Sequence, residues 1–272
     1  MLSILNSISS LTAENALSAT QTNLQKTLTS LSTGLKINSG SDDAAGLAIA
    51  NGLQANISAL TQSSQNASDG IGVLQTADGA LSQVTTLLNR AVTLATEASN
   101  GGLTTSQSTA LDTEYQSILS EVNQIGSTTN FNGGQVFSAT ALSTFTSDGT
   151  TSGTSTLSTT IGALSSTTLA LNTTDLTSAA NAATALTAIS AAVSSVAATR
   201  GSIGAAVNQL TADSNVENTE VTNLTSAQNN IQNADIGKTV AAMTQFNVLQ
   251  QTGMAAMSQS NQAQQAVLKL LQ

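Results

Sequence analysis

The chain has 272 residues, of which only 8% are charged, against roughly 25% in ordinary globular proteins. Aromatic residues make up 2%, so few bulky side chains are available to fill a thick globular core, and the absence of proline suits long helices. The formal charge is −9 and the six basic residues stand singly, which excludes a basic surface for nucleic acid or an anionic membrane. Without histidine or cysteine, the usual catalytic bases and most metal ligands are missing, so we expect neither an enzyme nor a cofactor.

The first 35 residues predict a helix with a narrow apolar side. Its leucines follow one another at steps of 7, 4, 3 and 4, which is the spacing of a heptad seam rather than of a broad core face. They are Leu17, Leu24, Leu28, Leu31 and Leu35. The opening stretch MLSILNSISSLTAENALS has neither a basic region nor a long apolar run, so we expect no cleaved signal peptide and no membrane-spanning helix there.

Residues 36–45 predict a joint, because Gly34 and the INSGS stretch interrupt the helical pattern. We expect Ser41 to cap a second helix and Asp42 and Asp43 to lie in its first turn, where the helix dipole stabilises carboxylates by roughly 0.3–1 kcal/mol. The alternative is an acidic catalytic or metal site. It is disfavoured, because such a site needs further oxygen ligands and the chain has no calcium-binding loop motif.

The second helix is expected to run from near residue 43 to the SNGG stretch at 99–102. Its apolar residues alternate steps of three and four: Leu74, Ala77, Leu81, Val84, Leu88, Ala91 and Ala95. This stripe, like the leucines of the first helix, can be buried inside the chain or between copies of it. A third helix is predicted to open at Thr104 or Thr105, and NFNGGQVF at 130–137 predicts a hairpin.

Residues 138–178 change character, since more than half of them are serine or threonine and no helical period remains. We expect short exposed strands and loops in this segment. Helix is predicted to resume near Ser178 with heptad-compatible apolar steps, and residues 236–272 predict a final amphipathic helix.

We therefore predict a mainly α-helical protein. It would form a long antiparallel, coiled-coil-like helical rod with paired terminal helices and a short β-rich outer or hairpin element. Neither end can bury its apolar stripe alone, so partners are expected. The simplest partner is another copy of the same chain. The predicted domains are the terminal helices 1–35 plus 236–272, a spoke at 36–45, the rod 46–137 plus 179–235, and the Ser/Thr-rich outer element 138–178.

Several long stretches resemble the bacterial flagellins, the subunits of the flagellar filament. LSTGLKINSGSDDAAGLAIANGL at 31–53 closely resembles the N-terminal flagellin signature, as do NASDGIGVLQTADGAL at 66–81 and STTNFNGGQVF at 127–137. RGSIGAAVNQL at 200–210 and the stretches 217–237 and 249–272 follow the C-terminal pattern, although Ala263 stands where many relatives have proline.

The resemblance implies a subunit of an extracellular filament for swimming, built from this chain alone or from several flagellins. It also implies export without a cleaved signal peptide, through the flagellar export apparatus and an export chaperone, and contacts with filament cap and hook-junction proteins. The terminal segments would fold as they pack between subunits. The expected subunit contacts are Leu17, Leu24, Leu28, Leu31, Leu35, Asp42, Asp43, Val267, Leu268 and Leu271.

Some flagellins are detected by an animal Toll-like receptor through an arginine, a leucine and a glutamate. Arg90, Leu94 and Glu114 match those positions, whereas Ala91, Val92 and Thr93 depart from the pattern. The resemblance therefore implies a receptor contact that these departures weaken.

Two other functions fit the terminal patterns. A hook–filament junction protein shares the terminal helices, but the full signature at 31–53 favours the filament subunit. A cell-surface homologue that binds polysaccharide would differ only in 138–178, where Phe137 and Phe145 are the only nearby aromatic residues for stacking on a sugar.

Overall fold

A computed structural model describes residues 8–149 and 156–270, except for the side chains of residues 9, 264 and 267–270. The chain forms two compact units. The terminal unit comprises residues 1–55 and 223–272, and the central unit comprises residues 56–222. Two long helices, α2 (Ala44–Ala98) and α4 (Ala179–Gln232), contribute residues to both units.

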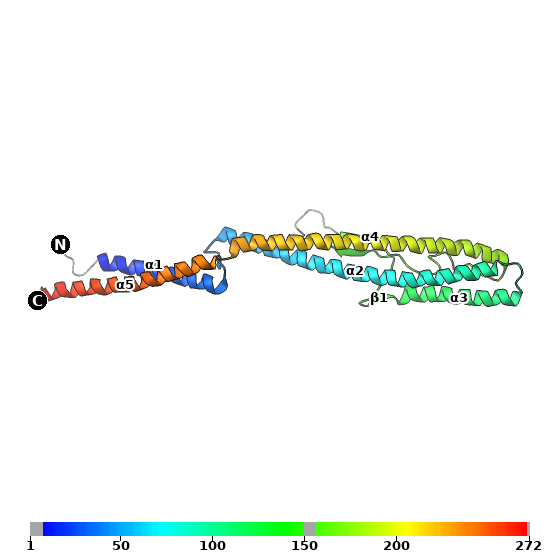
Figure 1. Ribbon diagram of the computed structural model, residues 1–272, viewed down its shortest axis with the longest axis horizontal. Coiled ribbons are helices and arrows are strands. Elements are labelled where there is room, and N and C mark those ends of the chain that lie inside the picture. The colour runs from blue at the N-terminus through cyan, green and yellow to red at the C-terminus, as the bar shows by residue number, and fades with distance from the viewer. Residues whose placement is uncertain (1–7, 150–155, 271–272) are drawn as a thin grey trace. The chain divides into compact units, whose positions relative to one another are not determined.

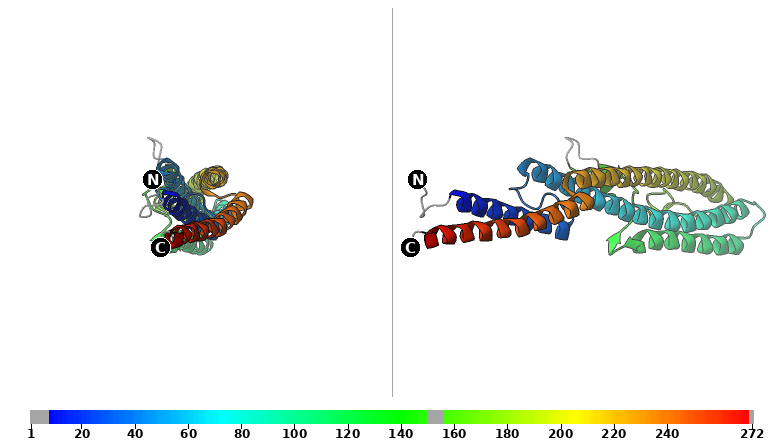
Figure 2. Two further views of the ribbon diagram at one scale, coloured as in Figure 1. Left: turned by 90° about the vertical axis from the view of Figure 1, so that its left-hand side faces the viewer. Right: turned by 60° about the vertical axis from the view of Figure 1, so that its left-hand side comes forward.

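In the central unit, α2, α3 (Thr105–Thr128) and α4 run side by side (Figures 1 and 2). All the residues of the predicted α2 stripe, from Leu74 to Ala95, are buried in one hydrophobic cluster. Tyr115 and Val122 from α3 join it, as do Ile189 and Leu210 from α4. The α2 stripe is therefore core within the chain and not a surface between copies.

The alanine-rich start of α4 has a mean hydropathy of 1.5 over an 18-residue window, so by length and composition this helix is apolar enough to cross a membrane. Core helices meet the same criterion, and Ala182, Ala185 and Ile189 from this stretch are buried in the hydrophobic cluster. Of this window, 28% is buried, so its apolar character reflects both core residues and exposed alanines.

The predicted cap of α3 and the predicted hairpin are confirmed, whereas the left-handed cap expected at Asn100–Gly102 after α2 is not, because none of these residues has a positive φ. Thr104 and Gln107 form a capping box at the start of α3, with the Thr104 backbone N–H donating to Gln107 Oε1 at 2.8 Å. Strands β1 (Asn130–Phe131) and β2 (Gly134–Gln135) pair antiparallel. Asn132 and Gly133 between them have φ of 49° and 80°, as a two-residue hairpin loop requires.

The prediction that residues 138–178 are exposed strands and loops is wrong for the second half of the segment. Strands β3 (Leu142–Phe145) and β4 (Thr156–Thr159) do form an antiparallel hairpin. Beyond it the chain is irregular but packs into the core, burying Ile161, Leu164, Leu171 and Leu176.

Side chains of α3 hold this irregular segment in place. Asp112 Oδ1 accepts from the Leu176 N–H at 2.8 Å, Asn123 Oδ1 accepts from the Ser166 N–H at 2.7 Å, and the Tyr115 and Thr174 hydroxyls bond at 2.5 Å. The bonds from Asp112 and Asn123 satisfy backbone N–H groups that regular structure would otherwise pair. Apolar residues can therefore be buried here without a periodic pattern, which is why the sequence does not reveal it.

Gly126→Ala tests this packing, because Gly126 of α3 lies directly beneath the Leu164 carbonyl and an added methyl group would overlap it. We expect the free energy of unfolding to fall by about 1–3 kcal/mol in chemical denaturation. Gly79→Ala is the control, since nothing lies within 4 Å of a methyl group there and a helical alanine should add roughly 0.5–1 kcal/mol. Equal shifts in the same direction would contradict the packing described.

Candidate functional site

The terminal unit is a pair of helices rather than a packed core. Helix α1 (Ile8–Thr33) lies alongside α5 (Ile236–Leu270) (Figures 1 and 2). Two contacts mark their approach: the Ser10 and Ser260 hydroxyls bond at 2.8 Å, and the Leu17 side chain packs over Gly253. The predicted pairing of the terminal helices is therefore observed within one chain.

This pair buries little apolar surface. Among the described residues of the terminal unit, the buried hydrophobic ones are Ile37 and Ala50, and neither belongs to α1 or α5. Of the predicted contact leucines, Leu28 is 42% exposed and the other four are half-buried. The remaining exposed large apolar side chains on the two helices are Ile8, Leu11, Ile236, Val240, Val248, Leu249 and Met254.

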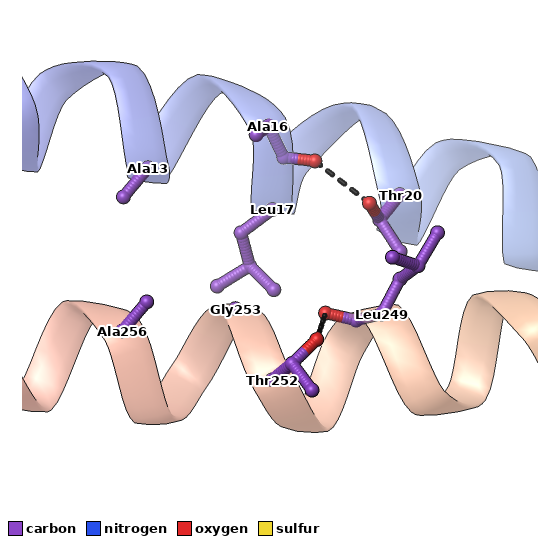
Figure 3. A pocket seen from close by; sticks show the side chains of 8 residues that line it. All are labelled: Ala13, Ala16, Leu17, Thr20, Leu249, Thr252, Gly253 and Ala256. Carbon is purple, nitrogen blue, oxygen red and sulfur yellow. Dashed lines mark hydrogen bonds between the residues drawn. The ribbon is translucent and has the colours of Figure 1, made fainter.

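A groove of about 330 Å³ lies between the two helices (Figure 3). It is lined by Ala13, Ala16, Leu17, Thr20, Leu249, Thr252, Gly253 and Ala256. Its two threonines donate their hydroxyl hydrogens to carbonyls of their own helices, Thr20 to Ala16 at 2.8 Å and Thr252 to Val248 at 3.0 Å. The lining therefore presents mainly carbon, which suits an apolar side chain better than a polar ligand.

The far end of α5 holds the other predicted contact residues. Val267 and Leu268 lie on the helix, but their side chains are not among those described, and Leu271 lies outside the described residues. Their contribution to a subunit contact stays a prediction.

The joint brings together two segments that are nearly 200 residues apart in the sequence. Gly34 ends α1 with a φ of +74°, a conformation that glycine adopts without strain. The Lys36 N–H then donates to the Gln232 carbonyl at 2.7 Å, and the Ala234 N–H donates to the Gly34 carbonyl at 2.9 Å. These bonds tie the link between α1 and α2 to the link between α4 and α5.

Asp42 and Asp43 lie before α2, so the expectation of a Ser41 cap with both aspartates in the first turn is wrong. Asp43 is itself the cap, because its Oδ1 accepts from the Gly46 N–H at 2.9 Å. The Ser41 hydroxyl bonds instead to the Ser39 hydroxyl at 2.7 Å. Aspartate and serine are almost equally good caps, so composition alone did not decide between them.

Asp42 organises the loop of the joint. One of its oxygens accepts from the Ser39 hydroxyl at 3.0 Å and from the Asn38 and Ser39 N–H groups at 3.2 and 3.0 Å, and Lys26 lies 3.7 Å from the other. The hydrogen bond from the Ser39 side chain is the main reason why the pKa of Asp42 lies below its usual value. Its stabilisation of the loop is present above the usual pKa and is lost as the pH falls through the lowered one.

The second half of the joint lies between α4 and α5 and was not predicted from the sequence. Asp235 caps α5, with Oδ1 accepting from the Lys238 N–H at 3.1 Å, and Leu35 forms a β-bridge with Asn233. The signal was present as Asn-Ala-Asp just before an apolar periodic segment, a common start to a helix. The pairing with residues 34–36 had no local signal.

The three positions matched to a receptor contact are not equally accessible. Arg90 and Glu114 are exposed, and Arg90 Nε donates to Glu114 Oε1 at 2.7 Å. This hydrogen bond raises the pKa of Arg90 and lowers that of Glu114. Leu94 is 0% exposed, so its side chain belongs to the core and offers no contact surface in this fold.

Within residues 8–149 and 156–270, no group of three or more Asp or Glu side chains is placed to hold a metal ion. The arrangement of the terminal unit is that of a surface for packing against another apolar surface.

Comparison with known proteins places both ends of the chain in one family. The pattern of the bacterial flagellin N-terminal helical region matches residues 4–142, and that of the C-terminal helical region matches residues 186–271. A flagellin of Halalkalibacterium halodurans is 35% identical over 249 residues, covering 91% of both chains. A flagellin of Serratia marcescens is 45% identical over 130 residues, which span 48% of this chain and 37% of that one.

The fold agrees. The crystal structure of Bacillus cereus flagellin matches with a TM-score of 0.50 at 27% identity, covering 56% of this chain and 88% of that one. The resemblance seen in the sequence is confirmed by these matches. The chain belongs to the bacterial flagellins, a family of structural proteins that form the subunits of the flagellar filament.

Proposed function

We propose that this chain polymerises with itself into the extracellular flagellar filament used for swimming, and that its terminal unit drives the assembly. The observation that carries the proposal is the missing core of that unit. Its helices leave nine large apolar side chains exposed among the described residues and place an apolar groove between them. A second copy of the chain can cover such surfaces with like surfaces.

The energetics favour ordering on assembly. Fixing the backbone of one residue costs roughly 1–2 kcal/mol of conformational free energy. Two helices whose apolar side chains stay half-exposed bury too little surface to offset this cost. Completing the burial of one leucine between subunits returns up to about 1.5–3 kcal/mol. We therefore propose that α1 and α5 acquire their full stability when the filament forms.

The net charge is distributed unequally between the two units, in a way that favours contact through the terminal unit. Four acidic and four basic residues lie in the terminal unit, which is therefore formally neutral. The other eleven acidic residues and two basic ones, Arg90 and Arg200, give the central unit the whole charge of −9. Copies can thus bring their terminal units together without net repulsion, whereas their central units repel and are screened by salt.

The finer assignments come from the family resemblance and are part of the proposal. Export would use the flagellar export apparatus and its chaperone, without a cleaved signal peptide, and the filament would meet cap and hook-junction proteins at its ends. Residues 36–45 would form a spoke between the terminal helices and the rod of residues 46–137 and 179–235, with 138–178 on the outside. Among the described residues, no feature favours the junction or polysaccharide-binding alternative.

Leu28→Asp tests the role of the terminal unit. Burying a carboxylate in place of a leucine should cost about 3 kcal/mol or more per subunit and raise the concentration needed for assembly by at least about 100-fold. The measurement is filament length and amount by electron microscopy, with circular dichroism to show that the central unit stays folded. Leu28→Met is the matched control and should assemble normally. Normal filaments from Leu28→Asp would refute the proposal.

The receptor contact, carried over from the family, is testable at the exposed ion pair. We propose that Arg90 and Glu114 form the contact and that Leu94 acts only by holding α2 in place. Arg90→Ala should lower receptor signalling by purified monomer at least about tenfold, as expected for losing a charged hydrogen bond worth roughly 1.5–3 kcal/mol. Asn89→Ala, an exposed neighbour on the same helix, should signal normally. Undiminished signalling by Arg90→Ala would dispose of the contact.

A further inference from the structure

The β3–β4 hairpin packs against α2 in the central unit, beside a buried glutamate of α4. Thr144 and Thr146 are buried, and Thr144 Oγ1 lies 2.7 Å from where a methyl group on Gly70 would stand. At the same place the Phe145 carbonyl accepts hydrogen bonds from the Ser63 hydroxyl and from Asn66 Nδ2, each at 3.4 Å.

Glu217 of α4 lies within this contact. It is 5% exposed, its Oε1 is 2.5 Å from the Ser63 Oγ, and its Oε2 is buried with no hydrogen-bond partner. An ionised carboxylate that is buried with one oxygen unsatisfied is costly, whereas a neutral carboxylic acid is much less so. Proximity to Ser63 gives a proton on Oε1 an acceptor.

The Ser63 hydroxyl has one hydrogen and two neighbours that can accept it. When Glu217 is protonated, its O–H donates to Ser63 Oγ, and Ser63 is free to donate to the Phe145 carbonyl. When Glu217 is ionised, the carboxylate takes the Ser63 hydrogen, because a charged acceptor is the stronger one. The Phe145 carbonyl then loses the bond from Ser63 and keeps the one from Asn66.

We propose that the proton on Glu217 controls the attachment of the β3–β4 hairpin to α2, with Ser63 as the link between them. The hairpin is fully attached when Glu217 is neutral and is loosened when the proton is lost to water. This device lies in the central unit and is independent of assembly through the terminal unit.

The surrounding charges favour the neutral form. Burial raises the pKa of Glu217, the hydrogen bond from Ser63 lowers it, and the negative charges of Asp213 and Glu220 raise it. No basic residue lies on the stretches that pack here, 56–70 of α2, 142–149 and 210–222 of α4. Their remaining charged residues, Asp69 of α2 and Asp148 of the hairpin segment, are acidic. Attachment is therefore strongest below the usual pKa of 4.5 and weakens as the pH rises through the raised value.

The absence of tryptophan from the chain allows a single reporter on the hairpin. Phe145→Trp keeps the backbone carbonyl that makes the contact and replaces a ring that is 37% exposed. We expect its fluorescence emission to move to longer wavelength in one proton transition as the pH is raised from acidic to neutral. Adding Glu217→Gln should make the emission wavelength independent of pH and hold it at the value of the attached hairpin. Adding Glu220→Gln, three residues along the same helix, should keep the transition and move its midpoint to lower pH, because the charge of Glu220 raises the pKa of Glu217.

Ser63→Ala tests whether Ser63 transmits the protonation state of Glu217 to the hairpin or only contributes to packing. In the reporter protein it should remove most of the amplitude of the pH response, whereas Ser64→Ala, which loses hydrogen bonds to Ser214 and Asn218 but none to the hairpin, should keep it. A purely structural role for Ser63 would lower the stability equally at all pH values and leave the response intact. That result would refute the link.

A second measurement uses the unmodified protein. Amide hydrogen exchange of residues 142–145, corrected for the intrinsic effect of pH, should accelerate roughly fivefold over the same transition, the factor for one lost hydrogen bond of about 1 kcal/mol. Glu217→Gln should abolish this acceleration. A flat reporter signal together with pH-independent exchange would overturn the proposal, as would a transition that survives Glu217→Gln.

Discussion

The constraint on which the molecule depends is that α1 and α5 do not bury their apolar seam by packing on each other alone. In the central unit a third helix and the irregular segment 161–176 close over the stripe of α2, so Leu74, Leu88 and their neighbours lose all contact with water. Among the described residues of the terminal unit, no further element buries the apolar side chains of α1 and α5, and residues such as Leu28 and Met254 stay exposed. The same heptad-like spacing therefore yields a finished core in one unit and an unfinished one in the other.

The joint fixes where α1 ends and α5 begins in the terminal unit. Gly34 turns the chain out of α1, Asp43 and Asp235 start the helices on either side, and backbone bonds link residues 34–36 to 232–234. The Asp42 carboxylate accepts hydrogen bonds from its own loop and so has a structural role. Acidic residues in the signature are thus structural, which agrees with a family of filament subunits rather than enzymes.

Most of the fold could be predicted because its helices are long and regular. The start of α3 with its capping residue Thr104 and the Asn132–Gly133 turn follow from local chemistry. The burial of Leu164 and Leu171 could not be predicted, since it depends on hydrogen bonds from Asp112 and Asn123 far away in the sequence. For the site, spacing identified the exposed Leu28, whereas matching a family motif selected Leu94, which the fold buries. Periodicity indicates that a side chain is buried, but not whether its own chain or another copy covers it.

The most direct test of the central claim compares the full chain with a shortened chain lacking 1–35 and 236–272, by electron microscopy over a series of salt concentrations. The account predicts that the full chain forms helical filaments, and does so more readily as salt screens the −9 charge of the central unit. The shortened chain should stay folded and monomeric at every salt concentration. Filaments from the shortened chain would contradict the account, because they would place the driving force for assembly in the central unit.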